Sequence, residues 1–135
     1  MSPTTMRFIL SSLVYLLLGV VLGVLFLAFP NTRGLRAVHV HLNLVGFVLF
    51  MIMGVAYHIL PRFRGRPLIS EKLAVVQFWL AEVGLVGLLV FMGIDAYQSQ
   101  VAISPMAITT GLVVFGTALV VSIVLFVYNL GRTLY

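Results

Sequence analysis

Cysteine is absent from the 135 residues, and charged side chains make up only 8% of them. The absence of cysteine excludes disulfides and thiolate metal sites. So low a charged fraction, beside 62% hydrophobic residues, excludes a water-soluble domain with a polar surface. The chain is therefore expected in a lipid bilayer. Its net charge of +5 is expected to report orientation in the membrane and not a nucleic-acid partner.

Long apolar runs are abundant. A hydrocarbon layer about 30 Å thick requires roughly 20 apolar residues in helical form, because backbone polar groups cannot stay unpaired in lipid. Four stretches meet this length: residues 8–29, 38–60, 73–94 and 105–130. The sequence predicts an all-α integral membrane protein, a single domain over residues 1–135 built as a bundle of four transmembrane helices. The first stretch is expected to remain as a helix, because it is longer than the apolar region of a secretory signal peptide.

Basic residues are distributed unevenly between the two sides of this expected bundle. One side holds Arg7, Arg62, Arg64, Arg66, Lys72 and Arg132, and the other holds Arg33 and Arg36 with Asp95. Cytoplasmic loops of membrane proteins carry an excess of lysine and arginine. Both termini are therefore expected in the cytoplasm, as in a multi-pass protein of a bacterial or archaeal cytoplasmic membrane.

The three histidines of the chain all lie in the segment HVHLNLVGFVLFMIMGVAYHILPRF, residues 39–63. His41 and His58 are about 25 Å apart along a helix axis, so they cannot bind one metal through bonds of about 2 Å. His39 and His41 are about 200° apart around the helix and face different neighbours. One interpretation is that each histidine forms hydrogen bonds at the membrane interface. The other is that neutral imidazoles bind a transition metal or haem iron.

The sequence HLN at residues 41–43, with GFVLFMIMGVAYHILPRF after it, resembles the second transmembrane helix of the haem-copper oxidase catalytic subunit. It is similar in particular to the nitric oxide reductase large subunit and to the high-affinity oxidases. In those proteins a histidine two residues before an asparagine is an axial ligand of the low-spin haem b. The resemblance therefore implies a haem b ligand at His41, near the outer surface. The family helix closes with a G-x-x-Y-Y-like step, and residues 54–61 occupy that stretch here.

Later helices of the full catalytic subunit carry the second ligand of the low-spin haem and the histidines of the high-spin haem and its partner metal. The stretches 73–94 and 105–130 contain no histidine. The resemblance therefore implies a short, four-helix relative that lacks most histidines of an oxidase or nitric oxide reductase active site. A turnover reaction is not indicated.

A second axial ligand for a haem at His41 must come from another chain, a methionine or solvent, because His39 faces away. A homodimer is the simplest source. His41 of both copies would share one haem, or His41 of one copy and His39 of the other would bind two symmetry-related haems. Arg33 and Arg36 are candidate cations for the haem propionates, or contact lipid head groups. Asn43 is expected to orient a ligand or to hydrogen-bond across helices.

Polar residues nearer the other end of the second stretch leave two interpretations open. His58 lies with Tyr57 beside the arginine-rich sequence PRFRGR at residues 61–66, where Pro61 is expected to end the helix. A second haem or a quinone head group is one candidate occupant of this region. In the other interpretation both side chains anchor the helix at the interface and the arginines enforce topology.

Glu82 falls near the middle of the third stretch, where an ionised side chain is costly and usually faces a polar interior. A proton relay and a structural hydrogen bond between helices are the two interpretations. Gln77, Thr109 and Thr110 are expected to complete a buried polar seam with it. The glycine pairs Gly19/Gly23 and Gly84/Gly87 indicate close helix packing or room for a flat ligand.

These observations favour a membrane b-type cytochrome that binds haem b and serves electron transfer or the binding of a diatomic gas, O2 or NO. Expected partners are membrane lipid, a second copy of the chain, and a quinone or redox protein. The competing hypothesis is a non-haem protein, either a transition-metal carrier that uses His39 and His41 or an accessory membrane subunit.

Overall fold

The computed structural model describes all 135 residues and consists of helices and short connections. Four helical spans are long and apolar enough to cross a membrane: α1 (Pro3–Ala28), a second span (Pro30–Phe63), α4 (Glu71–Ala96) and α5 (Pro105–Leu134). A short 3-10 turn, η3 (Gln98–Gln100), lies between α4 and α5. The predicted all-α bundle with four transmembrane helices is confirmed.

Serine caps begin three of the four spans. The side-chain oxygens of Ser2, Ser70 and Ser104 accept hydrogen bonds from the backbone N–H groups of Thr5, Leu73 and Ala107. Proline follows the cap in α1 and α5, where its missing N–H costs nothing because that group has no partner inside a helix. Polar capping residues therefore extend α1 and α4 at their starts beyond the apolar ranges that hydropathy predicts.

The second span has four consecutive parts, and the sequence predicted only a plain helix for it. These are the 3-10 helix η1 (Pro30–Leu35), α2 (Arg36–His41), the π-helix η2 (Leu42–Leu49) and α3 (Phe50–Phe63). A π-helix bonds residue i to i+5 and is therefore wider than an α-helix. Such segments recur at functional sites, and this one begins directly after His41.

The end of α3 differs from the prediction that Pro61 terminates the helix. Pro61 lies inside α3, which continues to Phe63. The chain turns at Gly65, whose φ of 62° lies in the left-handed region. The Gly65 N–H donates to the Arg62 carbonyl at 3.0 Å, and the Arg66 N–H donates to the Pro61 carbonyl at 3.1 Å. These two bonds form a Schellman motif, so Gly65 and not Pro61 ends the helix.

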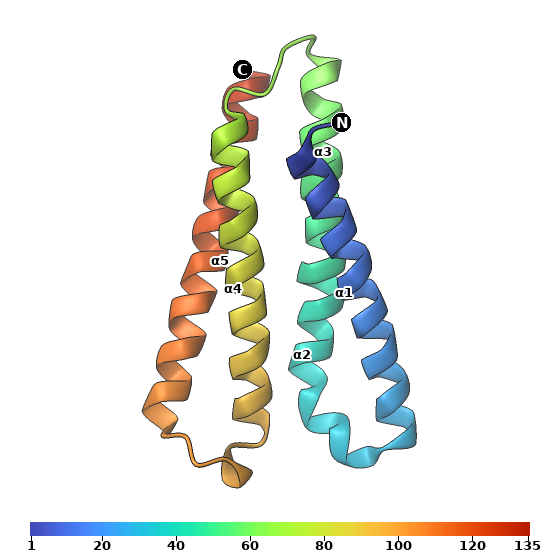
Figure 1. Cartoon of the computed structure of the whole chain (residues 1–135), viewed down its shortest axis with the longest axis vertical. Coiled ribbons are helices and arrows are strands. Elements are labelled where there is room, and N and C mark those ends of the chain that lie inside the picture. The colour runs from blue at the N-terminus through green and yellow to red at the C-terminus, as the bar shows by residue number, and fades with distance from the viewer.

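The bundle is a pair of helical hairpins, which Figure 1 shows side by side. The first hairpin packs α1 against the second span, and the second packs α4 against α5. Both chain termini lie at one end, here called the terminal end, together with the loop of residues 64–70. At the opposite end the Tyr97 hydroxyl donates to the Asn31 carbonyl at 2.7 Å, so the two other loops are joined directly.

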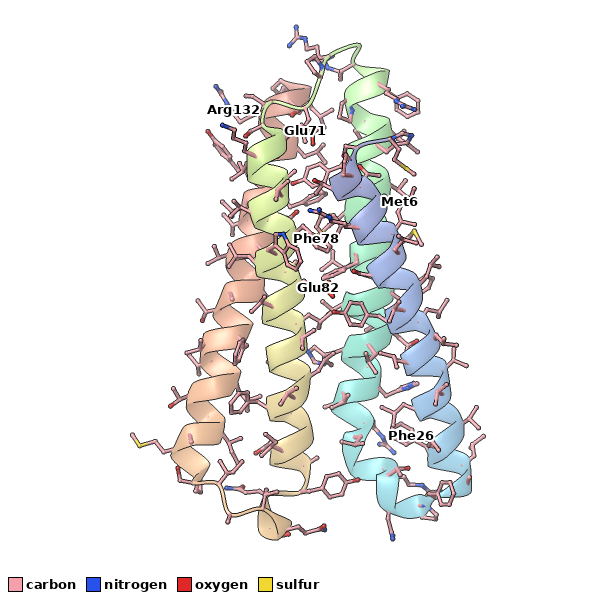
Figure 2. The ribbon with its side chains drawn as sticks, in the orientation of Figure 1. Met6, Phe26, Glu71, Phe78, Glu82 and Arg132 are labelled. Atoms are coloured by element: carbon pink, nitrogen blue, oxygen red, sulfur yellow. The ribbon has the colours of Figure 1, made fainter.

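Aromatic side chains join the hairpins in the half of the bundle nearer the terminal end. Phe8 is fully buried and makes edge contacts with Phe50 and Phe78, at centroid distances of 5.4 and 4.9 Å. Phe78 points from α4 towards the first hairpin in Figure 2. Tyr57 packs on Phe126 of α5 at 5.1 Å. These contacts bury α1, α3, α4 and α5 around one core, while most other large apolar side chains face outwards.

Orientation in the membrane remains a prediction. The even number of spans places both termini at one end of the bundle. The excess of lysine and arginine at that end supports a cytoplasmic location for it.

Candidate functional site

His39 lies in the interface between α2 and α1. Its Nδ1 is 3.0 Å from the Gly19 carbonyl oxygen, and its ring makes an edge contact with Phe26 at a centroid distance of 5.3 Å. A Cβ added to Gly23 would lie 3.1 Å from the His39 ring. Gly19 and Gly23 therefore make room for an imidazole, and the small-residue step in α1 is explained by the side chain that it receives.

Asn43 lies beside His39 and not beside His41. Its Nδ2 donates to the backbone carbonyl of His39 at 2.8 Å, one turn earlier in the same helical segment. A Cβ on Gly19 would be 2.6 Å from that nitrogen. Asn43 thus fills the gap over Gly19 while bonding within its own helix, so the expected hydrogen bond across helices is not formed.

His41 is half-exposed and is turned away from the α1 interface. Its Nδ1 lies 2.9 Å from the Ala37 carbonyl oxygen. A carbonyl oxygen only accepts, so Nδ1 carries the proton in this arrangement and Nε2 holds the free lone pair. Histidines that bind metals are commonly oriented in this way, with one ring nitrogen donating to a backbone carbonyl. His41 therefore presents a ligand atom on the face where the π-helix begins.

The donor set fits one axial position of a haem per chain. His39 is held against α1, and His58 lies seventeen residues after His41 in the same span. Arg33 and Arg36 are exposed at the same end as His41, where cations for two propionates would be required. The structure brings together no group of three histidine, cysteine, aspartate or glutamate residues able to hold a metal ion. The predicted roles of Arg33 and Arg36 stay predictions.

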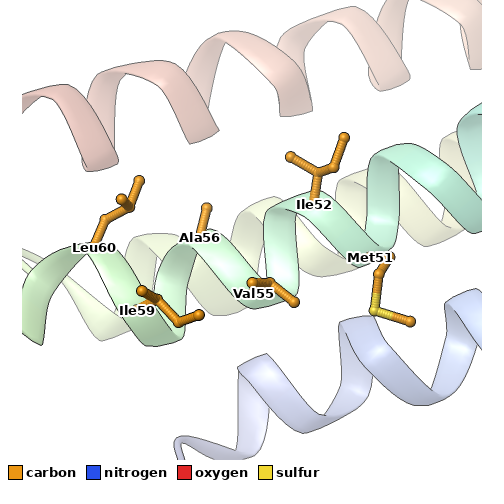
Figure 3. A pocket seen from close by; sticks show the side chains of 6 residues that line it. All are labelled: Met51, Ile52, Val55, Ala56, Ile59 and Leu60. Carbon is orange, nitrogen blue, oxygen red and sulfur yellow. The ribbon is translucent and has the colours of Figure 1, made fainter.

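A groove on α3 is separate from His41. It has a volume of about 420 Å³, and six apolar side chains line it: Met51, Ile52, Val55, Ala56, Ile59 and Leu60. Figure 3 shows these side chains along one helix, with no polar atom among them except the sulfur of Met51. The groove begins ten residues after His41, about 15 Å along the axis. It offers apolar contact to a lipid chain, and the Met51 sulfur is its one atom able to bind a metal.

His58 and Tyr57 occupy different environments despite being neighbours. The His58 Nε2 accepts a hydrogen bond from Arg62 Nη1 at 2.9 Å, so His58 is neutral in this contact. Tyr57 is only 6% exposed, and its ring packs between Phe8 and Phe126. Tyr57 is therefore a core residue and not an anchor at the membrane interface. The role of His58 as a second haem ligand stays a prediction.

Glu82 joins the two hairpins. The Tyr15 hydroxyl of α1 donates to Glu82 Oε1 of α4 at 2.9 Å, while Oε2 is buried without a hydrogen-bond partner. Figure 2 shows the Glu82 side chain between the hairpins. Tyr15 was missed because its neighbours are all apolar or small. The signal that was available is its phenolic hydroxyl, which needs a partner in the middle of a membrane span.

The expected seam around Glu82 has different members. Gln77 Nε2 donates to the Ser122 hydroxyl of α5 at 3.2 Å and lies 3.3 Å from the Met53 sulfur. Thr109 and Thr110 are exposed near the start of α5, and the Thr110 hydroxyl donates to the Met106 carbonyl. The prediction that these two threonines face Glu82 is wrong, because α5 turns its small and buried residues towards α4.

Taken together, the chain is an integral membrane four-helix protein with an oriented imidazole near one end. The sequence model of the family described as cytochrome C and quinol oxidase polypeptide I matches residues 4–135. The chain belongs to this family, whose members bind haem. Comparisons with curated proteins and with solved structures found no match. The recognition of a short relative of the haem-copper oxidases is thereby confirmed.

Proposed function

We propose that this protein is a membrane b-type cytochrome that binds haem b through His41. One observation carries the proposal: the His41 Nδ1 is held by the Ala37 carbonyl, which leaves Nε2 as a ligand atom in a chain of a haem-binding family. The proposed location is a bacterial or archaeal cytoplasmic membrane, with His41 near the outer surface. Haem would supply a one-electron redox centre and a position for a diatomic gas.

A homodimer completes the proposed site. Each chain offers one imidazole on the His41 face, so a second copy is the simplest source of the other axial ligand. Two His41 side chains would share one haem. The alternative, in which His41 of one copy pairs with His39 of the other, would require His39 to turn out of its contact with α1. Two histidine ligands favour electron transfer, with a quinone or redox protein as partner. An open sixth position favours binding of O2 or NO.

Residues other than the ligand have separate proposed tasks. Arg33 and Arg36 would neutralise the two propionates from the loop that precedes the ligand. The Ala37 carbonyl fixes the imidazole orientation, and Gly19 with Gly23 fixes His39 on the opposite face of the same segment. A metal carrier that chelates through His39 and His41 is less well supported, because these two rings bond to carbonyls on different sides of the helix.

The test is a reduced-minus-oxidised visible spectrum of the detergent-purified chain, with haem per chain and chain copies measured on the same sample. Sharp alpha and Soret bands are expected, with one haem for two chains in the shared arrangement and two for two chains in the paired arrangement. His41→Ala is expected to remove most bound haem. Two haems per chain, with one of them lost in His58→Ala, would identify His58 as a second ligand. Haem loss in His39→Ala would identify the paired arrangement.

A colourless protein from haem-sufficient cells, or full haem retention in His41→Ala, would contradict the proposal. Far-UV circular dichroism of each variant separates loss of haem from loss of fold. An unchanged helical signal is expected, because His41 is half-exposed and its side chain bonds only within its own helix.

A further inference from the structure

A polar cavity lies at the terminal end of the bundle, far from His41. It has a volume of about 220 Å³, is open to the surface, and is lined by the start of α1, the end of α3, the loop after it and the start of α4. The side chains that matter for its chemistry are Thr5, Tyr57, Arg62, Arg66 and Glu71. Three of the four spans therefore contribute to one site, whose lining also includes His58.

The cavity wall is rich in hydrogen-bond donors. Arg62 donates one N–H to His58 at 2.9 Å, and this bond fixes the guanidinium while leaving its other N–H groups available. Thr5 is 1% exposed, and its hydroxyl oxygen accepts from Ser2 at 3.2 Å, so its own hydrogen is free to donate. The buried hydroxyl of Tyr57 forms no hydrogen bond, although the Asn129 side chain of α5 lies near it. Buried polar groups without partners are costly, so this wall favours a ligand with acceptor oxygens.

The charges on the wall favour an anionic ligand. Arg62, Arg66 and the amino group of Met1 bring positive charge, and Glu71 brings one negative charge. Glu71 is exposed in the first turn of α4, where the helix dipole stabilises a carboxylate. The excess of positive charge matches a phosphodiester, and guanidinium groups bind phosphate oxygens through paired N–H donors.

The backbone explains why these two arginines share one cavity. The Schellman motif at Gly65 reverses the chain after α3, so that Arg66 returns beside the last turn, which contains Arg62. Arg64 lies between them in sequence. All three arginines are exposed, but Arg64 does not line the cavity. Arg62 stands at the end of a transmembrane span, where lipid phosphates lie. Basic pockets between transmembrane helices commonly hold such head groups.

We infer that this cavity binds the phosphate group of an anionic phospholipid. Arg62 and Arg66 contact the phosphate oxygens, and the hydroxyls of Thr5 and Tyr57 donate to the remaining acceptors. The bound lipid joins α1, α3 and α4 at the terminal end. This site shares no residue with the surroundings of His41, although His58 lines it.

The experiment is native mass spectrometry of the full chain taken from nanodiscs of phosphatidylcholine with a fixed fraction of phosphatidylglycerol. Retention of phosphatidylglycerol is expected in the unmodified chain. Arg62→Gln and Arg66→Gln are each expected to weaken retention about tenfold, because one charge-assisted hydrogen bond is lost. Arg64→Gln is the matched control, of equal charge change in the same turn, and retention is expected to stay unchanged.

Three outcomes would overturn the inference. An equal loss of phosphatidylglycerol retention in Arg64→Gln would show that the lipid responds to the total surface charge of this end and not to the cavity. Retention unchanged in both Arg62→Gln and Arg66→Gln would exclude the cavity. Tyr57→Phe, which keeps the core ring, guards against misfolded arginine variants and is expected to weaken retention a few-fold. A second measurement adds inorganic phosphate to the detergent-solubilised chain and follows its thermal unfolding. If phosphate raises the unfolding temperature in a saturable way and phosphatidylglycerol is not retained, the ligand is free phosphate and not a lipid.

Discussion

The two hairpins use glycine for different purposes. In the first hairpin, Gly19 receives Asn43, Gly23 receives His39, and the ring of Tyr15 lies over Gly46. Polar or aromatic side chains are thus enclosed between α1 and the second span. In the second hairpin, a Cβ on Gly84 would lie 2.9 Å from the backbone nitrogen of Leu119. There α4 and α5 approach each other through their backbones.

The first hairpin holds the polar side chains of the candidate site, and the second hairpin packs against it as a scaffold. Polar side chains in lipid need a partner, and the first hairpin supplies carbonyls and glycine gaps for them. The second hairpin packs small and apolar residues, with Phe115 over Gly87 and Phe91 over Gly111. A substitution at glycine is therefore expected to cost most where the added atoms meet backbone, as at Gly84, and to be correctable where they meet a movable side chain, as at Gly19.

The largest effect is expected for Gly84→Leu. The new side chain would collide with the backbone of α5, which cannot move aside without separating the helices. A loss of about 1–3 kcal/mol in unfolding free energy is expected from such overpacking. Reversible unfolding in mixed micelles, followed by far-UV circular dichroism, measures it.

Gly131→Leu is the matched control for this substitution. No atom lies within 4 Å of a Cβ at Gly131 in the same hairpin. Its unfolding free energy is expected to stay within about 0.5 kcal/mol of the unmodified protein. Equal losses at Gly84 and Gly131 would contradict the assignment of backbone contact to Gly84.

A smaller effect is expected for Gly19→Ala in the first hairpin, about 1 kcal/mol, because the added methyl group displaces the amide of Asn43. The amide is a movable side chain, so Asn43→Ala should remove the conflict. In the Asn43→Ala background, Gly19→Ala is expected to cost nothing, and the double-mutant cycle measures this coupling. Additive losses would show that the two residues do not interact.

The smallest effect is expected for Tyr15→Phe, which removes the hydrogen bond to Glu82 between the hairpins. Hydrogen bonds between transmembrane helices contribute about 0.6 kcal/mol on average. A loss of this size is expected in the unfolding assay, and Tyr15→Phe should have no further effect in a Glu82→Leu background. A loss that persists in that background would assign it to another contact of the Tyr15 hydroxyl.

The four transmembrane spans could be predicted from hydropathy, because a bilayer accepts segments according to their apolar length. Residues 8–29 and 73–94 were predicted correctly as spans for this reason. Their ends were less well predicted. Ser2 and Ser70 extend α1 and α4 through caps that an apolar count does not register. Pro61 was given too much weight, since a proline near the end of a helix removes only one hydrogen bond.

The candidate site was predictable only in part. His41 was identified through its resemblance to a family helix, whereas its bond to Ala37 depends on a side-chain torsion that the sequence does not specify. The opposite directions of His39 and His41 followed from helical geometry, and the glycine gaps for His39 did not. Tyr15 as the partner of Glu82 required knowledge of which hairpins meet, which no local pattern contains.

The π-helix η2 divides the second span into two halves. The directions in which side chains point around the helix axis can differ between the two halves. Residues advance by about 100° each in an α-helix, so one residue added or removed where the helix widens rotates everything beyond it by about that angle. The half with His41 keeps its neighbours in α1, and the half with Tyr57 and Arg62 keeps its own. A single-residue insertion or deletion in Leu42–Leu49 is thus a route by which evolution can re-aim the imidazole end while leaving the arginine end in place.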